Sequence, residues 1–474
     1  MSMHQLAEAH LRAVPDQLCE AAPVRLTGLD TAFLCLDRDV SPMHLGALVT
    51  FEPAKLTDAE SVAALLAQRA QRLPQLRRRV APSWTPFAAS TWVDEPGFSA
   101  KDHIQVHDLG RHASLHNAAA LAAELMVHPL MRNRPLWEVH VIAGVGWDRF
   151  AVLFKMHHAF GDGLNALEIG VRMLDARAVR GDDTASSAEL VHGSSAASNG
   201  SVLARLWHAP GDVRDVVEGV VVQLSDVTRM AAEVLRSARL PAAGSPLAIS
   251  SSGRRALAVA SLDLQRIRRI RRAYGGTIND VLLSVVTGAL RDWLAARGSP
   301  VDGLILRAFI PVSQRARTGQ RMGGNRLSGY FCELPVGEPD PSERLLLIRR
   351  AMERNRAAGT SRGPGAIPEL IDRLPAAVHR IAAPVAGQGA CLLFDLLVTS
   401  IPVPNIRLTL DGAALAEVFP IAPLVAGQAL VIGLSWYRGR AHLALYADRD
   451  GLPDVQHLAD AVEPAACALS CLTE

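Results

Sequence analysis

Apolar positions along this chain recur with two different periods, which predicts both helices and strands in each half. In the first half, residues 121–128 and 164–176 follow a helical period, and the second of these begins just beyond an Asp-Gly turn. Residues 137–142 and 150–156 are short apolar runs typical of buried strands. The second half contains a strongly apolar helix at 279–296 and strand candidates at 304–311, 330–334, 393–401, 429–437 and 441–447. This pattern predicts two α/β domains of similar size.

A polar segment at about residues 180–202, rich in Ser, Ala and Gly, separates the two halves. Such a composition cannot bury a core and indicates a flexible linker. A helical stretch with an apolar side follows at 216–240, and a second polar segment, 245–255, leads into the next patterned region. We therefore predict an N-terminal domain at 1–180, a linker with a crossover helix at 181–250, and a C-terminal domain at 251–474.

Composition and charge narrow the class of protein. Hydrophobic residues make up 49% of the 474 residues and the net charge is +2, which excludes a disordered chain and gives no global sign of nucleic-acid binding. The arginine clusters at 77–79 and 266–272 favour solvated helix faces, with contact to an anionic surface as the alternative. Six scattered cysteines indicate free thiols in a reducing cytoplasm. No apolar run reaches the roughly 18 residues of a spanning helix, and no signal peptide is recognisable.

The strongest chemical signal is the segment His-His-Ala-Phe-Gly-Asp-Gly at residues 157–163, directly after a predicted strand. An imidazole titrates near neutral pH, so it can accept a hydroxyl proton and later return it. Neighbouring strand residues point to opposite faces, so only one of His157 and His158 can face a cleft. Asp162 returns toward the pair through a glycine turn, where it could fix a tautomer or pair with an arginine. Structural histidines at a strand end are the alternative, but the added turn favours catalysis.

Other reaction chemistries lack a signature here. There is no Gly-x-Ser-x-Gly elbow and no phosphate-binding glycine loop. We predict no metal site, because adjacent strand histidines diverge and no third ligand is near. Direct attack by an acceptor hydroxyl, activated by one histidine, fits this pattern.

The motif resembles the active-site signature of the acyltransferase superfamily that includes chloramphenicol acetyltransferase and peptide-synthetase condensation domains. Further stretches narrow the resemblance to the bacterial wax ester synthase/diacylglycerol acyltransferase family, and they occur in order over about residues 25–455. They are 29–34, 42–46, the Pro-Leu-Trp element Pro135, Leu136 and Trp137, the Asn-Asp element Asn279 and Asp280, 311–313, 324–328, 419–420 and 427–428.

The resemblance implies two chloramphenicol acetyltransferase-like α/β sandwich domains with the active site at their interface. It implies an O-acyltransferase that moves a fatty acyl group from acyl-CoA to diacylglycerol or a long-chain alcohol. His158 would be the general base, His157 would support the loop, and Asp162 would brace it before Gly163. No cofactor is bound permanently, since acyl-CoA is a substrate. The partners are a lipid or other alcohol and a membrane or lipid-droplet surface, and the location is cytoplasmic, with peripheral membrane contact as an option.

Two elements of the resemblance have a second interpretation. Asn279 could donate a hydrogen bond near the thioester oxygen while Asp280 anchors its helix. A helix N-cap pair is the simpler alternative, since both residue types favour that position. Pro135, Leu136 and Trp137 favour strand entry and core packing over contact with substrate.

Three departures from the family pattern leave the substrate open, one of which is an unusual loop after Gly319. Val403 stands where the family commonly has glycine, which could reshape a pocket. Asn165 follows the Asp-Gly where a small residue is frequent. A tailoring acyltransferase that esterifies a specialised metabolite from a CoA-bound or carrier-bound donor would look similar. A catalytically silent lipid-binding protein is an alternative of another class.

Overall fold

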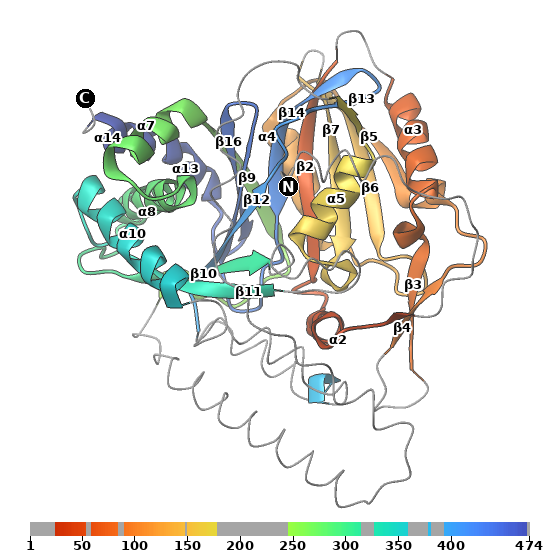
Figure 1. Ribbon diagram of the computed structural model, residues 1–474, viewed down its shortest axis with the longest axis horizontal. Helices are drawn as coiled ribbons and strands as arrows, with labels where there is room; N and C mark the ends of the chain where they lie inside the picture. The colour runs from red at the N-terminus through yellow and green to blue at the C-terminus, as the bar shows by residue number, and fades with distance from the viewer. Residues whose placement is uncertain are drawn as a thin grey trace, which may run out of the picture.

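The computed structural model describes residues 24–53, 58–83, 90–146, 149–177, 245–313, 327–358, 378–380 and 393–471. Within these residues, two large mixed sheets lie next to each other, and helices cover their outer sides (Figure 1). The predicted crossover helix at 216–240 and the motif residues 324–326 lie outside the described residues.

The first large sheet has seven strands in the order β5-β6-β7-β2-β14-β13-β8. One face packs on α3 (Ala59–Gln71), and the other packs on α4 (Leu115–Val127), which also contacts β9 of the second sheet. The seven strands therefore lie between these two helices, and β7 leads into the histidine motif. The strands are β2 (His44–Glu52), β5 (Ile104–Ala113), β6 (Trp137–Val145), β7 (Arg149–His157), β8 (Asp175–Arg177), β13 (Arg407–Leu410) and β14 (Ala413–Ile421).

The second large sheet has six strands in the order β11-β10-β12-β15-β16-β9. Its strands are β9 (Arg255–Asp263), β10 (Leu306–Ser313), β11 (Leu327–Leu334), β12 (Leu396–Pro402), β15 (Leu430–Tyr437) and β16 (Arg440–Asp448). The helices of this half gather on its outer side (Figure 1). They are α7 (Leu264–Tyr274), α8 (Ile278–Ala296), α10 (Pro341–Ala358), α13 (Val455–Asp460) and α14 (Val462–Cys471).

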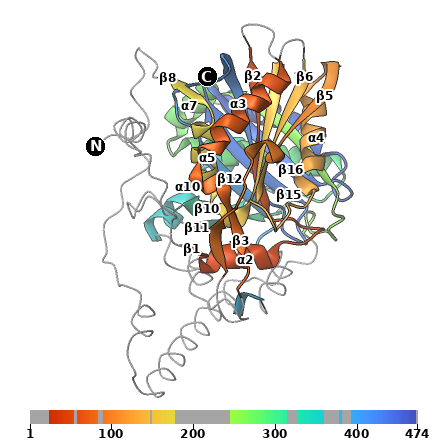
Figure 2. The same cartoon turned by 90° about the vertical axis from the view of Figure 1, so that its right-hand side faces the viewer.

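A small third sheet lies beside α2 (Gly28–Leu36) at the lower end of the first large sheet (Figure 2). It has the order β1-β4-β3, with β1 at Val24–Arg25, β3 at Arg78–Ala81 and β4 at Thr91–Asp94. Thr27 caps α2 and forms a capping box with Asp30, which fixes where this helix begins. The histidine motif lies directly against α2.

The two large sheets share strands and core rather than meeting at a simple boundary. Strands β13 and β14 come from the second half of the chain but complete the first sheet. The close approach of β14 to β15 depends on Gly433, where a Cβ would lie 2.0 Å from the carbonyl oxygen of Pro420. One hydrophobic cluster contains Leu48 and Phe419 of the first sheet together with Val431 of the second. The domain limits at residues 180 and 250 therefore stay a prediction, and the second half contributes to both sheets.

Most predicted elements are present, with shifted ends. The helix predicted at 164–176 is the clearest correction, because α5 covers Gly163–Arg172 and residues 175–177 form strand β8 instead. Asp175 and the residues after it pair with β13, a contact between distant parts of the chain that a local helical period cannot reveal.

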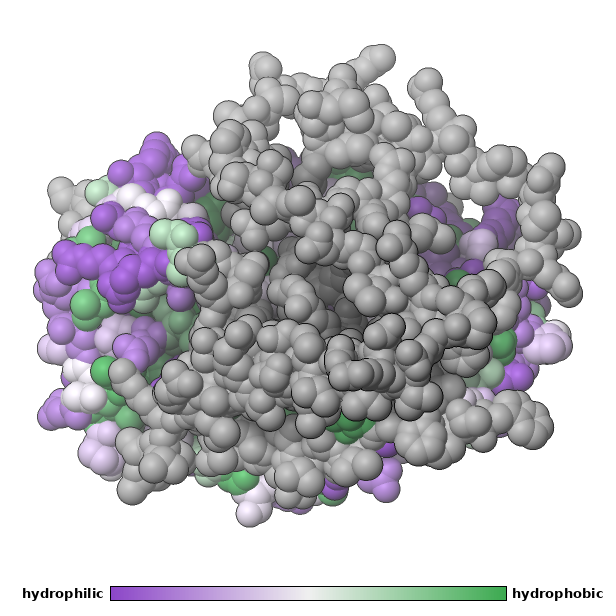
Figure 3. All heavy atoms as spheres, turned by 60° about the horizontal axis from the view of Figure 1, so that its bottom comes forward, coloured by the Kyte–Doolittle hydropathy of each residue, from purple (hydrophilic) through white to green (hydrophobic). Residues whose placement is uncertain are grey.

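The arginines of segment 266–272 lie on the solvent side of α7, as predicted, whereas Arg78 and Arg79 lie on strand β3, so the helix face predicted for 77–79 is wrong. Leu264, Ile267 and Ile270 are buried, while Arg269 and Arg272 are exposed. Figure 3 shows mainly hydrophilic side chains at the side of the molecule where the helices of this half lie. Among the described residues, no helix is both long enough and apolar enough to cross a membrane.

Candidate active site

His157 is a buried residue at the end of β7, held on both sides of its ring. Nδ1 accepts a hydrogen bond from the Ala159 backbone N–H at 3.0 Å, and Nε2 faces Asp37 Oδ2 at 3.4 Å. A ring nitrogen that accepts an N–H carries no proton, so the neutral ring has its proton on Nε2, toward the carboxylate. The ring of His44, paired with His157 across β2 and β7, lies edge-on at 6.1 Å. His157 therefore belongs to the support of the loop.

Asp37, at the C-terminal end of α2, contacts His157, Arg132 and the backbone of Met43. Its Oδ1 accepts the Met43 backbone N–H at 2.9 Å, and its Oδ2 accepts from Arg132 at 2.9 Å. Burial alone would raise the pKa of this carboxyl, but the contact with His157 and the Met43 N–H hold the pKa below its usual range. Asp37 is therefore a carboxylate at neutral pH. Asp37 belongs to no recognisable motif of the sequence.

His158 begins a short 3-10 turn, His158–Phe160, directly after the strand. Its backbone N–H donates to the Met43 carbonyl oxygen at 2.7 Å, and its half-buried ring stacks on Phe33 of α2 with the ring centres 3.9 Å apart. The two histidines face different surroundings, as predicted, but the cause is different. The strand ends at His157, so the change to a turn separates the two rings, and strand alternation does not.

Asp162 is fully buried and is the N-cap of α5 (Gly163–Arg172), where its side chain accepts the Asn165 backbone N–H at 3.0 Å. The Asn165 side chain in turn donates to the Phe160 carbonyl oxygen at 3.1 Å. A Cβ added at Gly163 would lie 3.1 Å from Ile401 of β12. The turn after the histidines is thus braced from within, and it touches the second sheet at Gly163.

Asn279, in the first turn of α8, also contacts strand β12. Its side-chain Oδ1 accepts a hydrogen bond from Ser400 Oγ at 2.6 Å, and Ser400 is the neighbour of Ile401 on β12. No acceptor for the Asn279 side-chain N–H groups occurs in the described parts of the chain. Asn279 and the end of the histidine motif thus contact successive residues of β12, whose side chains point to opposite faces of the sheet.

The N-cap interpretation of Asn279 and Asp280 is wrong, because Thr277 is the N-cap of α8. Asp280 completes the capping box from the third helical position, where Oδ2 accepts the Thr277 N–H at 2.9 Å. Its carboxylate is fully buried and also pairs with Arg356 through two contacts of 3.1 and 3.2 Å. Asp280 thus anchors its helix, and Asn279 lies one residue before it with its side chain turned to β12.

Pro135, Leu136 and Trp137 support the histidine strand from β6. The Leu136 carbonyl oxygen accepts the His157 backbone N–H at 3.0 Å. Trp137 is 2% exposed, its indole N–H donates to the Leu76 carbonyl oxygen at 2.8 Å, and its ring stacks on His103 at 4.5 Å. Pro135 is buried at the start of the strand. These contacts agree with the predicted packing role.

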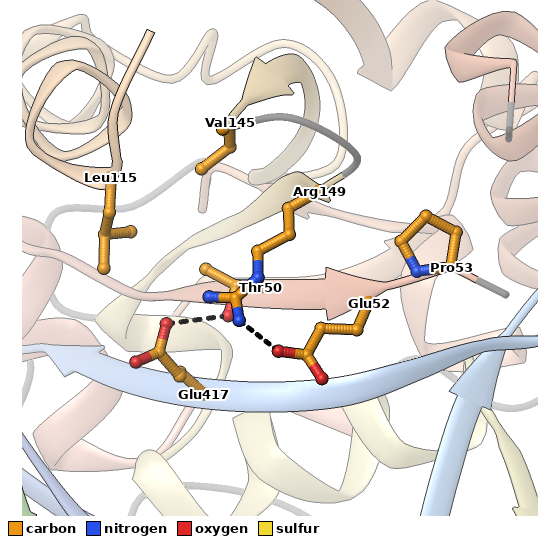
Figure 4. A pocket seen from close by; sticks show the side chains of 8 residues that line it. Thr50, Glu52, Pro53, Leu115, Val145, Arg149 and Glu417 are labelled. Atoms are coloured by element: carbon orange, nitrogen blue, oxygen red, sulfur yellow. Dashed lines mark hydrogen bonds and ion pairs between the residues drawn. The ribbon is translucent and has the colours of Figure 1, made fainter. Parts of the chain in front are cut away.

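A cavity of about 390 Å³ lies elsewhere, between β2, β14 and the turn from β6 to β7 (Figure 4). Thr50 and Arg149 line it, at the opposite ends of β2 and β7 from His44 and His157. Its charged groups are already engaged, since Arg149 pairs with Glu52 and Glu417 accepts the Thr50 hydroxyl at 3.1 Å (Figure 4). The histidine loop offers the reactive groups, so it is the better candidate for the chemistry.

Comparison with known proteins decides the family. Residues 26–282 match the wax ester synthase/diacylglycerol acyltransferase catalytic domain, and residues 323–469 match the C-terminal domain of the same family. The chain belongs to the wax ester synthase/diacylglycerol acyltransferase family. It is therefore an acyltransferase, and the family resemblance seen in the sequence is confirmed.

Similar proteins span nearly the whole chain. The probable diacylglycerol O-acyltransferase tgs1 of Mycobacterium tuberculosis is 29% identical over 462 residues, which cover 95% of this chain and 96% of that protein. The wax ester synthase/diacylglycerol acyltransferase of Marinobacter aquaeolei superposes with a TM-score of 0.68 at 23% identity, covering 95% of this chain and 100% of that one. The trichothecene 15-O-acetyltransferase of Fusarium sporotrichioides has a TM-score of 0.58 at 12% identity, covering 97% and 99%. The predicted two-domain acyltransferase fold is confirmed.

Three further residues contact the two histidines but do not belong to the histidine motif: Phe33, Asp37 and His44. Each acts through a contact with a residue more than a hundred positions away. Phe33 and His44 do lie inside stretches that carry the resemblance, 29–34 and 42–46, so that resemblance was the available signal. Asp37 falls between those stretches.

Proposed function

We propose that the protein transfers a fatty acyl group from acyl-CoA to the hydroxyl of diacylglycerol or a long-chain alcohol, with His158 as the general base. The observation that carries the proposal is the setting of His158. Its ring is half-buried against Phe33, on a turn whose far end, Gly163, contacts β12 next to Ser400 and Asn279. The similarity to tgs1 supports the acceptor class.

The reaction needs one base and one donor of hydrogen bonds to the developing oxyanion. His158 takes the proton of the acceptor hydroxyl while the hydroxyl oxygen attacks the thioester carbonyl. The tetrahedral intermediate carries its negative charge on the former carbonyl oxygen. When it collapses, the carbon–sulfur bond breaks, an ester forms, and the departing thiolate receives the proton from His158. The balance requires no further reactant.

Asn279 suits the second role. Because Ser400 donates to its Oδ1, the amide nitrogen points away from Ser400 and its N–H groups are available to an oxyanion. Such a donor strengthens as charge develops, so it acts mainly in the transition state. Asp162 braces the turn that follows His158, and Asp280 anchors the helix that carries Asn279.

The solubility of the proposed substrates indicates where in the cell the reaction would take place. Acyl-CoA is water-soluble and is consumed, so we propose it as a substrate in the cytoplasm with no permanently bound cofactor. Diacylglycerol and long-chain alcohols partition into lipid, so the acceptor would come from a membrane or lipid-droplet surface. Val403, which replaces a glycine of the family pattern, is 7% exposed and belongs to the core of the first sheet. That departure therefore gives no support for a specialised acceptor.

The test is release of free coenzyme A from palmitoyl-CoA by the purified protein, with hexadecanol or diolein added separately. The wild type should release coenzyme A only when an acceptor is present, and the esters should be extractable. His158→Ala should lower turnover by about 10²–10⁴-fold, the usual loss for a general base. His116→Ala, at an exposed position, is the control for handling and folding. Full activity in His158→Ala would refute the base, and no release with either lipid would refute the proposed acceptors.

A further inference from the structure

We propose that Asp37 is the positioning residue of the two histidines, holding the ring of His157 in one tautomer and the backbone of His158 in place. Only the kinetic part of this inference rests on the proposed function. Asp37 lies at the C-cap of α2, outside the motif, and reaches both histidines by separate oxygens.

The first arm runs through Oδ2 to His157. Since His157 Nδ1 accepts the Ala159 N–H at 3.0 Å, the proton of the neutral ring must be on Nε2. Asp37 Oδ2 lies 3.4 Å from Nε2, an electrostatic contact rather than a hydrogen bond. The opposite tautomer would place two N–H groups against each other at Nδ1 and leave two acceptors facing each other at Asp37. The Ala159 N–H and the Asp37 carboxylate therefore favour the same tautomer of His157.

The second arm runs through Oδ1 to His158. Oδ1 accepts the Met43 N–H at 2.9 Å, and the Met43 carbonyl oxygen accepts the His158 N–H at 2.7 Å. Arg132 ties the carboxylate to α2, because it donates to Asp37 Oδ2 at 2.9 Å and to the Leu34 carbonyl oxygen at 3.0 Å. The same helix supplies Phe33, whose ring lies on His158. The end of α2 thus holds His158 in two ways: its backbone through Met43, and its ring through Phe33.

An asparagine cannot replace this carboxylate, although it has the same shape. Asp37 uses both oxygens as acceptors, and the amide of asparagine has only one. If its oxygen keeps the Met43 N–H, its NH₂ group meets the Nε2–H of His157. If the amide is turned over, the Met43 N–H loses its acceptor. Asp37→Asn must therefore break one arm, whereas Asp37→Glu keeps a carboxylate that can serve both.

The experiment compares wild type, Asp37→Asn, Asp37→Glu and the control Asp175→Asn. Asp175 forms the same kind of ion pair, with Arg69 at 2.7 Å, but touches no histidine. Histidine labelled with nitrogen-15 reports the tautomer of each ring in proton–nitrogen correlation spectra, and a labelled His157→Gln sample assigns the His157 signal. Turnover and KM are measured with palmitoyl-CoA and the better acceptor, and melting temperatures are recorded for all variants.

The wild type should show His157 protonated on Nε2. Asp37→Asn should lose that signal unless its amide is turned over, in which case the signal stays and the contact with the Met43 N–H is broken instead. Asp37→Asn should also lower kcat by about 10–10²-fold with little change in KM, because a misplaced base affects the chemical step. Asp37→Glu should recover both signal and rate, and Asp175→Asn should match the wild type. A wild-type ring protonated on Nδ1, or an unchanged His157 signal together with an unchanged kcat in Asp37→Asn, would overturn the inference. If the wild type transfers no acyl group, the proposed function fails while the tautomer measurement still decides the role of Asp37.

Discussion

The two histidines of the motif differ in what their removal would leave behind. His158 is half-buried on a turn, with one face of its ring on Phe33. The side chain of His157 is 2% exposed and lies between the Ala159 N–H and the Asp37 carboxylate. A general base must reach the substrate, so exposure favours His158, while full enclosure favours a supporting role for His157.

This difference predicts that His157→Ala lowers stability. The substitution leaves the buried Ala159 N–H without an acceptor and removes one partner of Asp37, and an unsatisfied buried group costs about 1–3 kcal/mol. We expect the free energy of unfolding to fall by about 2–4 kcal/mol, measured by urea unfolding with exposed His116→Ala as the control. A variant with wild-type stability but no activity would instead place His157 in the chemistry.

The turn between the 3-10 helix and α5 requires a glycine at position 161, although this residue has no role in the chemistry of the motif. Gly161 has φ +155°, and a Cβ there would lie 2.8 Å from Asn165 Cβ and 2.2 Å from its Nδ2. Asn165 occupies that space because its side chain donates to the Phe160 carbonyl oxygen. The departure of Asn165 from the family pattern is therefore matched by a glycine that makes room for it.

We predict that Gly161→Ala shifts this turn and lowers both stability and turnover. The Asn165 Cβ belongs to the start of α5 and cannot swing away, so the turn itself must move, and a displacement of the base by about 1 Å can cost about 10²-fold in rate. Gly170→Ala is the matched control, because Gly170 lies in α5 with no atom within 4 Å of an added Cβ. That control should be neutral or raise stability by about 0.5–1 kcal/mol. Equal activity of both variants would contradict the prediction.

The elements of the site were largely predictable because each has a local signal. The strand ending at His157, the turn through Gly163 and the helix carrying Asn279 all follow from periodicity and turn residues. The partners of these elements were not predictable in the same way. Asp37 has no motif of its own, and it becomes part of the site only because α2 is folded against the histidine turn.

The arrangement of the two large sheets was also only partly predictable from the sequence. Two α/β halves follow from the sequence pattern, but the transfer of β13 and β14 into the first sheet does not. A strand carries no local mark of which sheet it joins, since pairing depends on the shape of both partners. The exchange matters for function, because it places the second half against β2, the strand that begins at His44 beside His157.

Each large sheet contains a buried histidine that links folding to pH. Burial lowers the pKa of His44 to about 4, assisted by the charge of Lys155, and burial lowers the pKa of His442 to about 4. In the unfolded chain both titrate near 6.5. Between pH 6.5 and pH 4, the unfolded state therefore binds protons that the folded state does not. The free energy of unfolding must fall as the pH decreases through this window.

We predict a loss of about 2 kcal/mol for each of these histidines between pH 7 and pH 5. Urea unfolding at the two pH values measures it, and His44→Gln and His442→Gln should each reduce the difference by that amount. Exposed His116→Gln should keep the wild-type difference. The half-buried carboxylate of Glu138, with its pKa lowered to about 2, loses its contribution only below its usual pKa of 4.5, outside this window. A His44→Gln variant with the full wild-type pH dependence would show that folding leaves the pKa of His44 unchanged, contrary to its burial against Lys155.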